Sequence, residues 1–147
     1  MAKGYYGLSE KPGEEDCPVD ENGWFQTGDV AAITPDGFLQ ITDRTKDVIK
    51  SGGEWISSIE IENAAVTHPD IAEAAVIGRY HPKWTERPLL IAVAQPGRSL
   101  SKSDVLDFLR NKLHKMALPD DVVFIDELPH TATGKINKLG LRETFKD

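Results

Sequence analysis

Two short strand-like runs of apolar residues, Val30–Ile33 and Phe38–Thr42, lie in the first third of the chain. Residues 34–37, with the sequence TPDG, separate them. Proline followed by Asp-Gly between two apolar runs favours a tight turn, so the pattern predicts a β-hairpin. A third strand-like run, Asp47–Lys50, ends at the glycine pair Gly52-Gly53.

The first helix is predicted to begin near Ser57. Ser57 and Glu60 have the spacing of a capping box, in which each side chain bonds to the backbone of the other. Ile56 and Ile61 stand where a hydrophobic staple would pair them. We expect the helix to end by His68-Pro69, because proline disfavours helical conformation in the residue before it.

A second helix is predicted from Ser101 and Asp104 onward, through the segment SDVLDFLRNKLHKM. Apolar residues recur in it at helical spacing, which makes it amphipathic. These residues are Val105, Leu109, Leu113 and Met116.

Three further apolar runs, Ala72–Ile77, Leu89–Ala94 and Val122–Ile125, are predicted to be core strands. The first two are separated by Gly78–Pro88, which we interpret as a loop, and the polar loop His130–Lys135 leads to a short C-terminal helix. Mixed strands with interspersed helices indicate an α+β fold with helices packed on a small mixed sheet and a β-hairpin beside it.

Composition narrows the class of protein. The 147 residues are 39% apolar and 28% charged, which is ordinary for a soluble domain. The net charge of −7 argues against nucleic acid or an anionic membrane as the main partner, because both need a basic face. We see neither a signal peptide nor a transmembrane segment, and Cys17 has no partner for a disulfide, so a cytoplasmic protein is expected. Residues 1–22 have no sustained periodicity and are interpreted as a tail or loop.

Lys135 is the first candidate for chemistry, at the end of the polar segment Thr131–Lys135. A Walker A loop also ends in Gly-Lys, but it needs glycine and Ser/Thr where this chain has Pro129 and Ile136. What remains is a flexible loop with a compact positive charge that could stabilise phosphate or carboxylate oxygens. A plain solvent-exposed lysine fits the same pattern. The four histidines have no close pairing, so a zinc site is not expected.

Several residues could contact a nucleotide, although each also has a structural interpretation. Asp29, after Thr27-Gly28, could accept hydrogen bonds from ribose hydroxyls or could be a turn aspartate. If Lys46 and Lys50 alternate along a strand, they share one face near Arg44 and could hold phosphate; they could equally protect a solvated edge strand.

The glycine pair is followed by a large aromatic residue. Gly52-Gly53 would let a backbone approach a ligand closely, and Trp55 could stack on a base or anchor the core.

Three segments, taken together, resemble the last signature regions of the adenylate-forming (AMP-binding) superfamily, and most closely its fatty acyl-CoA ligase branch. They are GWFQTGD, DGFLQITDRTKDVIKSGGEW and LPHTATGKINK, in this order, and the likeness runs from about Gly23 to Phe145. The superfamily also includes luciferases and the adenylation domains of peptide synthetases.

The resemblance implies roles for the candidate residues. Asp29 would bind the ribose of ATP, Arg44 would contact the nucleotide, and Lys135 would reach the α-phosphate and the substrate carboxylate. Asp43 would be the hinge about which a small domain turns. Lys46, Lys50 and Trp55 match nucleotide-contacting positions, and Gly52, Gly53 and Glu54 would line the path of the CoA pantetheine.

The resemblance further implies a domain division: residues 1–42 would end a large N-terminal adenylation domain and residues 43–147 would form the small C-terminal lid domain. The phosphate-binding loop and acyl pocket of the large domain have no counterpart in the sequence, so the chain alone is expected to lack full activity. ATP, CoA, Mg²⁺ and a carboxylic acid, expected to be a fatty acid, would be the ligands of the complete enzyme. The alternatives are a stand-alone nucleotide- or CoA-binding or regulatory module, and a structural domain without a ligand.

Overall fold

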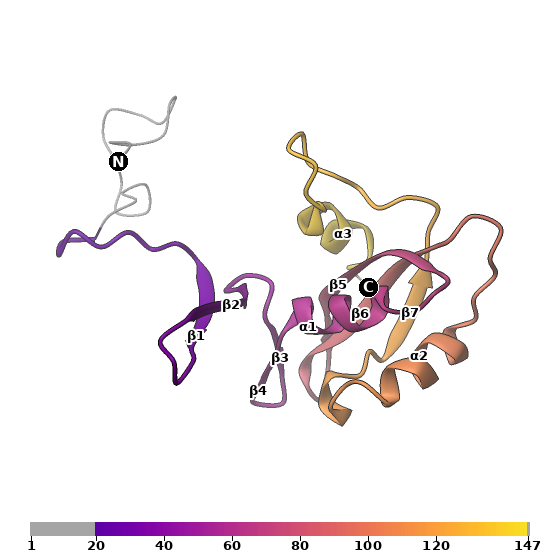
Figure 1. The fold of residues 1–147 in the computed structure, drawn as a ribbon, viewed down its shortest axis with the longest axis horizontal. Helices are drawn as coiled ribbons and strands as arrows, with labels where there is room; N and C mark the ends of the chain where they lie inside the picture. Colours follow the sequence, from indigo (N-terminus) through magenta and orange to yellow (C-terminus); the bar gives the residue numbers. More distant parts are fainter. Residues whose placement is uncertain (1–19, 147) are drawn as a thin grey trace.

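The computed structural model describes residues 20–146 (Figure 1). Most of the predicted N-terminal tail, including Cys17, lies outside these residues. The elements in chain order are β1 (Asp29–Ile33), β2 (Leu39–Arg44), β3 (Ile49–Ser51), β4 (Glu54–Ile56), α1 (Ser58–Val66), β5 (Ile71–His81), β6 (Thr85–Ala94), α2 (Lys102–Arg110), the 3₁₀ turn η1 (Lys115–Ala117), β7 (Asp121–Phe124) and α3 (Lys138–Thr144). The α+β fold class is confirmed. No helix within residues 20–146 is long and apolar enough to cross a membrane.

The first two strands form the predicted hairpin. β1 and β2 pair antiparallel, the Thr34 N–H donates to the Phe38 carbonyl at 2.9 Å, and Gly37 takes the positive φ of 84° that the turn requires. This two-stranded sheet stands apart from the larger sheet (Figure 1).

The larger sheet has five strands and is organised around β6. β5 pairs antiparallel along the whole of β6, from Ile71–Ala94 to His81–Thr85. The other edge of β6 is shared: β3 meets it only at Ser51–Thr85, and β7 runs parallel to it from Leu89 to Ala92. β4 closes the sheet beside β3 through the Gly52-Gly53 turn.

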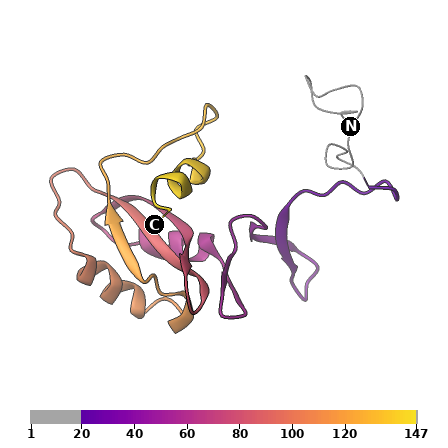
Figure 2. The same cartoon turned by 180° about the vertical axis from the view of Figure 1, so that it is seen from behind.

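Helices cover both faces of this sheet (Figures 1 and 2). On one face, α1 and α2 pack on alternate residues of β5, β6 and β7. The helices contribute Ile61, Ala65, Val105 and Leu109, and the strands contribute Ala74, Val76, Leu90, Ala92 and Val122. On the other face, α3 inserts Leu141 among the intervening strand residues Ala75, Ile77, Leu89 and Ile91, with Leu128 from the segment after β7. The period of two along the central strands therefore decides which helix each residue meets.

Both predicted helix starts are confirmed. Ser57 is the N-cap of α1 and its Oγ accepts the Glu60 N–H at 3.2 Å; Ser101 caps α2 and accepts the Asp104 N–H at 3.2 Å. The second helix is shorter than predicted, because it ends at Arg110. Leu113 is nevertheless buried, since the turn that follows folds back on the sheet.

Two interpretations of local structure are wrong. Gly78–Pro88 is not a long loop: β5 and β6 continue through it, and only residues 82–84 form the turn. The backbone ladder continues although the side chains become polar, and the His81 Nδ1 accepts the N–H groups of Lys83 and Trp84 at 3.1 and 3.2 Å. Lys46 and Lys50 do not alternate along one strand, because β3 begins only at Ile49 and Lys46 lies in the preceding turn.

Candidate functional site

Lys135 lies in a closed loop, next to the neck of that loop. His130 and Ile136 form an isolated bridge at its neck, and the Thr131 N–H donates to the Lys135 carbonyl at 2.7 Å. Gly134 has a φ of 78° and Thr131 Oγ1 accepts the Lys135 N–H at 3.2 Å, so the turn is tight and internally bonded. The Lys135 side chain is exposed and takes part in no ion pair within residues 20–146. The structure thus presents a free ammonium on a shaped loop.

Asp29 and Arg44 are brought together at the open end of the first hairpin. The Arg44 Nε lies 2.8 Å from the Asp29 Oδ1, and the two residues are paired across β1 and β2. A carboxylate and a guanidinium side by side offer both an acceptor and donors to a polar ligand such as a ribose.

Gly52 and Gly53 form the turn between β3 and β4, with φ angles of 58° and 90°. Trp55 is 66% exposed and therefore is not the core anchor that one interpretation of the sequence allowed; the Lys50 Nζ lies 5.8 Å from the centre of its ring. Glu54 is also exposed. The hairpin presents an aromatic face, a cation and an open backbone to solvent.

Gly52 is held from behind by the turn between β5 and β6. Its N–H donates to the Trp84 carbonyl at 2.9 Å, and a Cβ added at Gly52 would lie 2.5 Å from Cε3 of the Trp84 ring. We therefore expect Gly52→Ala to lower the free energy of unfolding by about 1–3 kcal/mol, through backbone strain and this clash. Gly53→Ala is the matched control, because a Cβ there meets nothing within 4 Å. Urea denaturation would measure both, and an equal loss in the two variants would contradict the role of the Trp84 contact.

Asp43 is 1% exposed and joins the first hairpin to α1. Its Oδ2 accepts the Ser58 N–H at 2.6 Å, and its Oδ1 accepts the Ser58 Oγ–H at 3.1 Å and the Arg44 N–H at 2.7 Å. The Ser57 Oγ donates to the Thr42 carbonyl at 2.8 Å beside it. Asp43 therefore sits at the junction where a hinge would lie, with its carboxylate bonded to the helix start.

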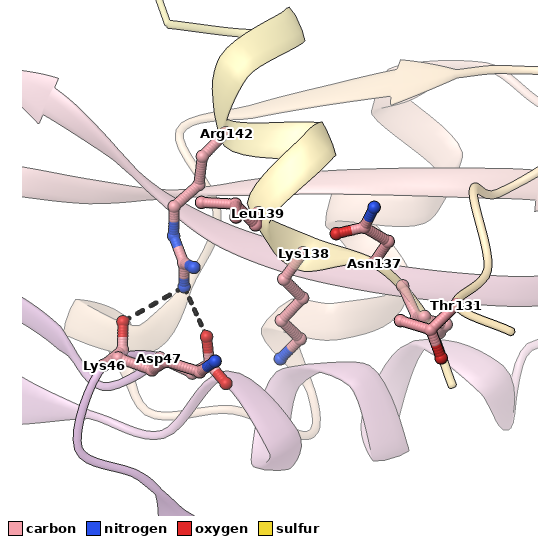
Figure 3. Close-up of a pocket in the computed structure, with 8 residues that line it drawn as sticks. Lys46, Asp47, Thr131, Asn137, Lys138, Leu139 and Arg142 are labelled. Atoms are coloured by element: carbon pink, nitrogen blue, oxygen red, sulfur yellow. Dashed lines mark hydrogen bonds and ion pairs between the residues drawn. The ribbon is translucent and has the colours of Figure 1, made fainter. Parts of the chain in front are cut away.

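A pocket lies between α3, the turn that contains Lys46 and Asp47, and the base of the Lys135 loop (Figure 3). Arg142 reaches across it from α3, with its Nη2 2.5 Å from the Asp47 Oδ1 and 3.1 Å from the Lys46 carbonyl. Lys138, one turn earlier on α3, points towards α1 in the same view. Lys46 is exposed at the rim.

Lys138 and Glu62 form an ion pair that is largely shielded from solvent. The Lys138 Nζ lies 2.7 Å from the Glu62 Oε1, and the side chains are 14% and 15% exposed. The same Glu62 oxygen accepts the Val76 N–H at 2.7 Å. Burial raises the pKa of the Glu62 carboxyl above its ordinary value of 4.5, although the Lys138 ammonium opposes the shift and the nearby Asp43 charge adds to it.

The raised pKa of Glu62 determines whether this residue stabilises or destabilises the fold as pH rises. Between pH 4.5 and the raised pKa the native state holds a proton that the unfolded state has lost, so this residue lowers the free energy of unfolding as pH rises through that range. We expect the carbon-detected NMR titration of the Glu62 carboxyl to have its midpoint above 4.5, and Glu62→Gln to remove this contribution. A midpoint at or below 4.5 would contradict the burial argument.

Sequence reasoning missed the contacts that α3 makes. Lys138 pairs with Glu62, and Arg142 pairs with Asp47. In each pair, 76 or more positions separate the two residues along the chain, so no local pattern in the sequence indicates the contact.

Similarity to known proteins identifies the family of this chain. Residues 60–135, just over half of the chain, match the model of the AMP-binding enzyme C-terminal domain. The chain belongs to this family. The predicted resemblance to adenylate-forming enzymes is thereby confirmed.

Relatives of this AMP-binding enzyme C-terminal domain are CoA ligases. The chain is 53% identical over its full length to the 3-methylmercaptopropionyl-CoA ligase of Ruegeria lacuscaerulensis and 47% identical to the medium-chain-fatty-acid–CoA ligase of Ectopseudomonas oleovorans. It spans 27% of the length of each of them.

Among solved structures, the AMP-binding enzyme C-terminal domain resembles ATP-bound MatB of Rhodopseudomonas palustris, with a TM-score of 0.82 and 35% identity over 88% of this chain and 26% of that one. It also resembles the fatty acyl CoA synthetase of Mycobacterium tuberculosis, with a TM-score of 0.70 and 39% identity over 90% of this chain and 26% of that one. The fold of these residues is therefore that of the corresponding part of larger enzymes.

Proposed function

We propose that residues 43–147 act as the C-terminal lid domain of an ATP-dependent acyl-CoA synthetase, and that residues 1–42 belong to the end of its large N-terminal domain. One observation carries the proposal. The Lys135 loop and the Gly52-Gly53 turn stand at opposite ends of one body (Figures 1 and 2), with Asp43 at the junction between that body and the first hairpin. A rotation about the junction would bring each end in turn to a common reaction centre.

In the first half-reaction, a carboxylate oxygen attacks the α-phosphorus of ATP and the bond to the departing pyrophosphate breaks. Charge on the α-phosphate oxygens has to be stabilised by positioned cations. The free ammonium of Lys135 supplies one, while Asp29 and Arg44 hold the ribose and the nucleotide. Lys46, Lys50 and Trp55 provide further nucleotide contacts.

In the second half-reaction, the sulfur of CoA attacks the carbonyl carbon of the acyl-adenylate and AMP leaves. Lys135 has no part in this step. The open backbone of Gly52 and Gly53, with Glu54 beside them, lines the path of the pantetheine arm after the domain has turned about Asp43. The bare backbone allows close approach because no side chain stands there.

ATP, CoA and a carboxylic acid, with a fatty acid as the proposed class, are the substrates in this proposal, and the large N-terminal domain is the partner. Mg²⁺ would be held mainly by the ATP phosphates and that domain, because Mg²⁺ in such sites is bound through substrate phosphates and one or two carboxylates. The similarity to ligases named for different acids supports placing acid selection in the large domain. We place the enzyme in the cytoplasm.

The test is a chimera. This sequence replaces the matching 27% of the Ectopseudomonas oleovorans ligase, and pyrophosphate release and acyl-CoA formation are assayed. Activity in the chimera and none in the 147-residue chain alone supports a lid domain. An inactive but folded chimera contradicts it.

Calorimetric titration of the chain with ATP, AMP and CoA distinguishes the lid domain from the alternative, a stand-alone binding module. A stand-alone nucleotide- or CoA-binding module predicts binding tighter than roughly 100 μM, which is about −5.5 kcal/mol. A lid that acts only when docked predicts no such binding.

A further inference from the structure

The base of the Lys135 loop is fixed by the helix that follows it. The Asn137 N–H donates to the Pro129 carbonyl at 2.7 Å, which closes the neck of the loop. Asn137 is also the N-cap of α3, and Lys138 is the first residue of that helix. Any rotation of α3 on the sheet therefore moves the neck of the loop with it.

α3 is seven residues long, and few of its side chains make apolar contacts with the rest of the fold. Leu141 is its one fully buried residue, with Phe145 partly buried beyond its end. Ile136, just before the helix, is also partly buried against the same cluster. Because these apolar contacts are few, the polar side chains of α3 contribute to its orientation.

Two cations one turn apart on α3 make this contribution (Figure 3). Lys138 binds α1: its Nζ lies 2.7 Å from the Glu62 Oε1 and donates to the Ser58 Oγ at 2.8 Å. Through Ser58 it is connected to the Asp43 carboxylate. Arg142 binds the turn after Asp43, at the Lys46 carbonyl and Asp47.

The hairpin of β3 and β4, which contains the Gly52-Gly53 turn, is supported by a different set of contacts. The Gly52 N–H donates to the Trp84 carbonyl, and the Lys50 N–H donates to the Glu86 Oε2 at 2.8 Å. Both supports come from the turn between β5 and β6 and its flank. Within residues 20–146, none of the hydrogen bonds or ion pairs of Lys138 or Arg142 reaches that hairpin.

We infer that Lys138, assisted by Arg142, is a positioning residue for Lys135: it fixes α3 to α1 and to the hinge residue Asp43, so that the Lys135 loop turns with the hinge as one rigid unit. The inference rests on the proposed function. It assigns Lys138 to the adenylate-forming half-reaction alone, because the support of the Gly52-Gly53 turn is separate.

The test uses the ligase chimera described above and measures the two half-reactions apart. Acid-dependent exchange of pyrophosphate into ATP reports adenylation, and CoA consumption with synthetic acyl-adenylate reports thioester formation. The variants are Lys138→Met, Lys138→Arg and the charge-balanced pair Glu62→Gln with Lys138→Met, which removes both charges of the ion pair. Lys102→Met is the matched control, because Lys102, on α2, also forms an ion pair: its Nζ lies 2.7 Å from the Asp121 Oδ1.

We expect the charge-balanced pair to lower adenylation by about 10–100-fold, the range expected from a displacement of about 1 Å, and to leave thioester formation unchanged. Lys138→Arg should recover most of the loss, and Lys102→Met should change neither rate. Equal loss in both half-reactions, or no loss in either, overturns the inference.

Amide hydrogen exchange in the 147-residue chain gives a readout without activity. In the charge-balanced pair the Asn137 N–H should exchange at least about tenfold faster while the Gly52 N–H keeps its protection, since local opening is set by local contacts. Unchanged exchange at Asn137 overturns the positioning role. If the unsubstituted chimera is inactive, the proposed function fails, and the exchange result still decides whether Lys138 holds the loop.

Discussion

We expect Lys135→Ala to slow adenylate formation by about 10²–10³-fold in the ligase chimera, equivalent to about 3–4 kcal/mol of transition-state stabilisation. The reason is that the Lys135 ammonium is exposed and unpaired within residues 20–146, so its charge is available to the α-phosphate oxygens that gain charge in the transition state. The measurement is acid-dependent exchange of pyrophosphate into ATP.

The same variant separates a catalytic role from a structural one. Because Lys135 is exposed and only its backbone bonds to the loop, the midpoint of urea unfolding should not change in Lys135→Ala. Thioester formation from synthetic acyl-adenylate should also be retained. Lys146→Ala, another exposed lysine, is the control for loss of one positive charge. A comparable loss of adenylation in Lys146→Ala would contradict the catalytic role of Lys135.

The second large effect is on stability. Lys138→Met should lower the free energy of unfolding by about 3–5 kcal/mol at neutral pH, because it leaves the Glu62 carboxylate shielded from water without its cation and close to the charge of Asp43. Lys102→Met removes a lysine from an equally short but exposed ion pair, and should cost less than about 1 kcal/mol. Urea denaturation of the 147-residue chain measures both.

Adding Glu62→Gln to Lys138→Met should recover a large part of the lost stability, because neither substituted side chain then carries a charge. Recovery would show that the cost comes from an unpaired carboxylate. If the double variant is no more stable than Lys138→Met, the loss instead reflects packing of the lysine stem against its neighbours.

Local signals predicted a large part of the fold. The TPDG turn, the Ser57 and Ser101 caps and the glycine pair each act within a few residues, so their conformations follow from nearby sequence alone. The three signature segments also named Lys135, Asp29 and Arg44, and the structure places the last two 2.8 Å apart. Their roles in catalysis stay predictions.

What the sequence did not show depends on distant partners. The strands continue through Gly78–Pro88 because each supplies the backbone partner of the other, whatever the side chains. The Lys138–Glu62 pair forms only when α1 and α3 meet at the sheet edge formed by β5, and the periodicity of neither segment predicts this contact. Lys46 is not in a strand because residues 44–48 form a turn, in which the Arg44 carbonyl accepts the N–H groups of Asp47 and Val48 at 2.8 and 3.0 Å, and Arg142 adds a contact to the Lys46 carbonyl.

The first hairpin has a consequence for how the chain unfolds. Ile33, Phe38, Leu39 and Ile41 are all exposed on it, and the hairpin has no layer of helix or sheet beneath it within residues 20–146. A two-stranded hairpin without such a layer is marginally stable in water. We therefore expect proteases to cut residues 29–41 well below the temperature at which the five-stranded sheet and its helices unfold. The chain would then have two cooperative units, and its melting curve would report only the second.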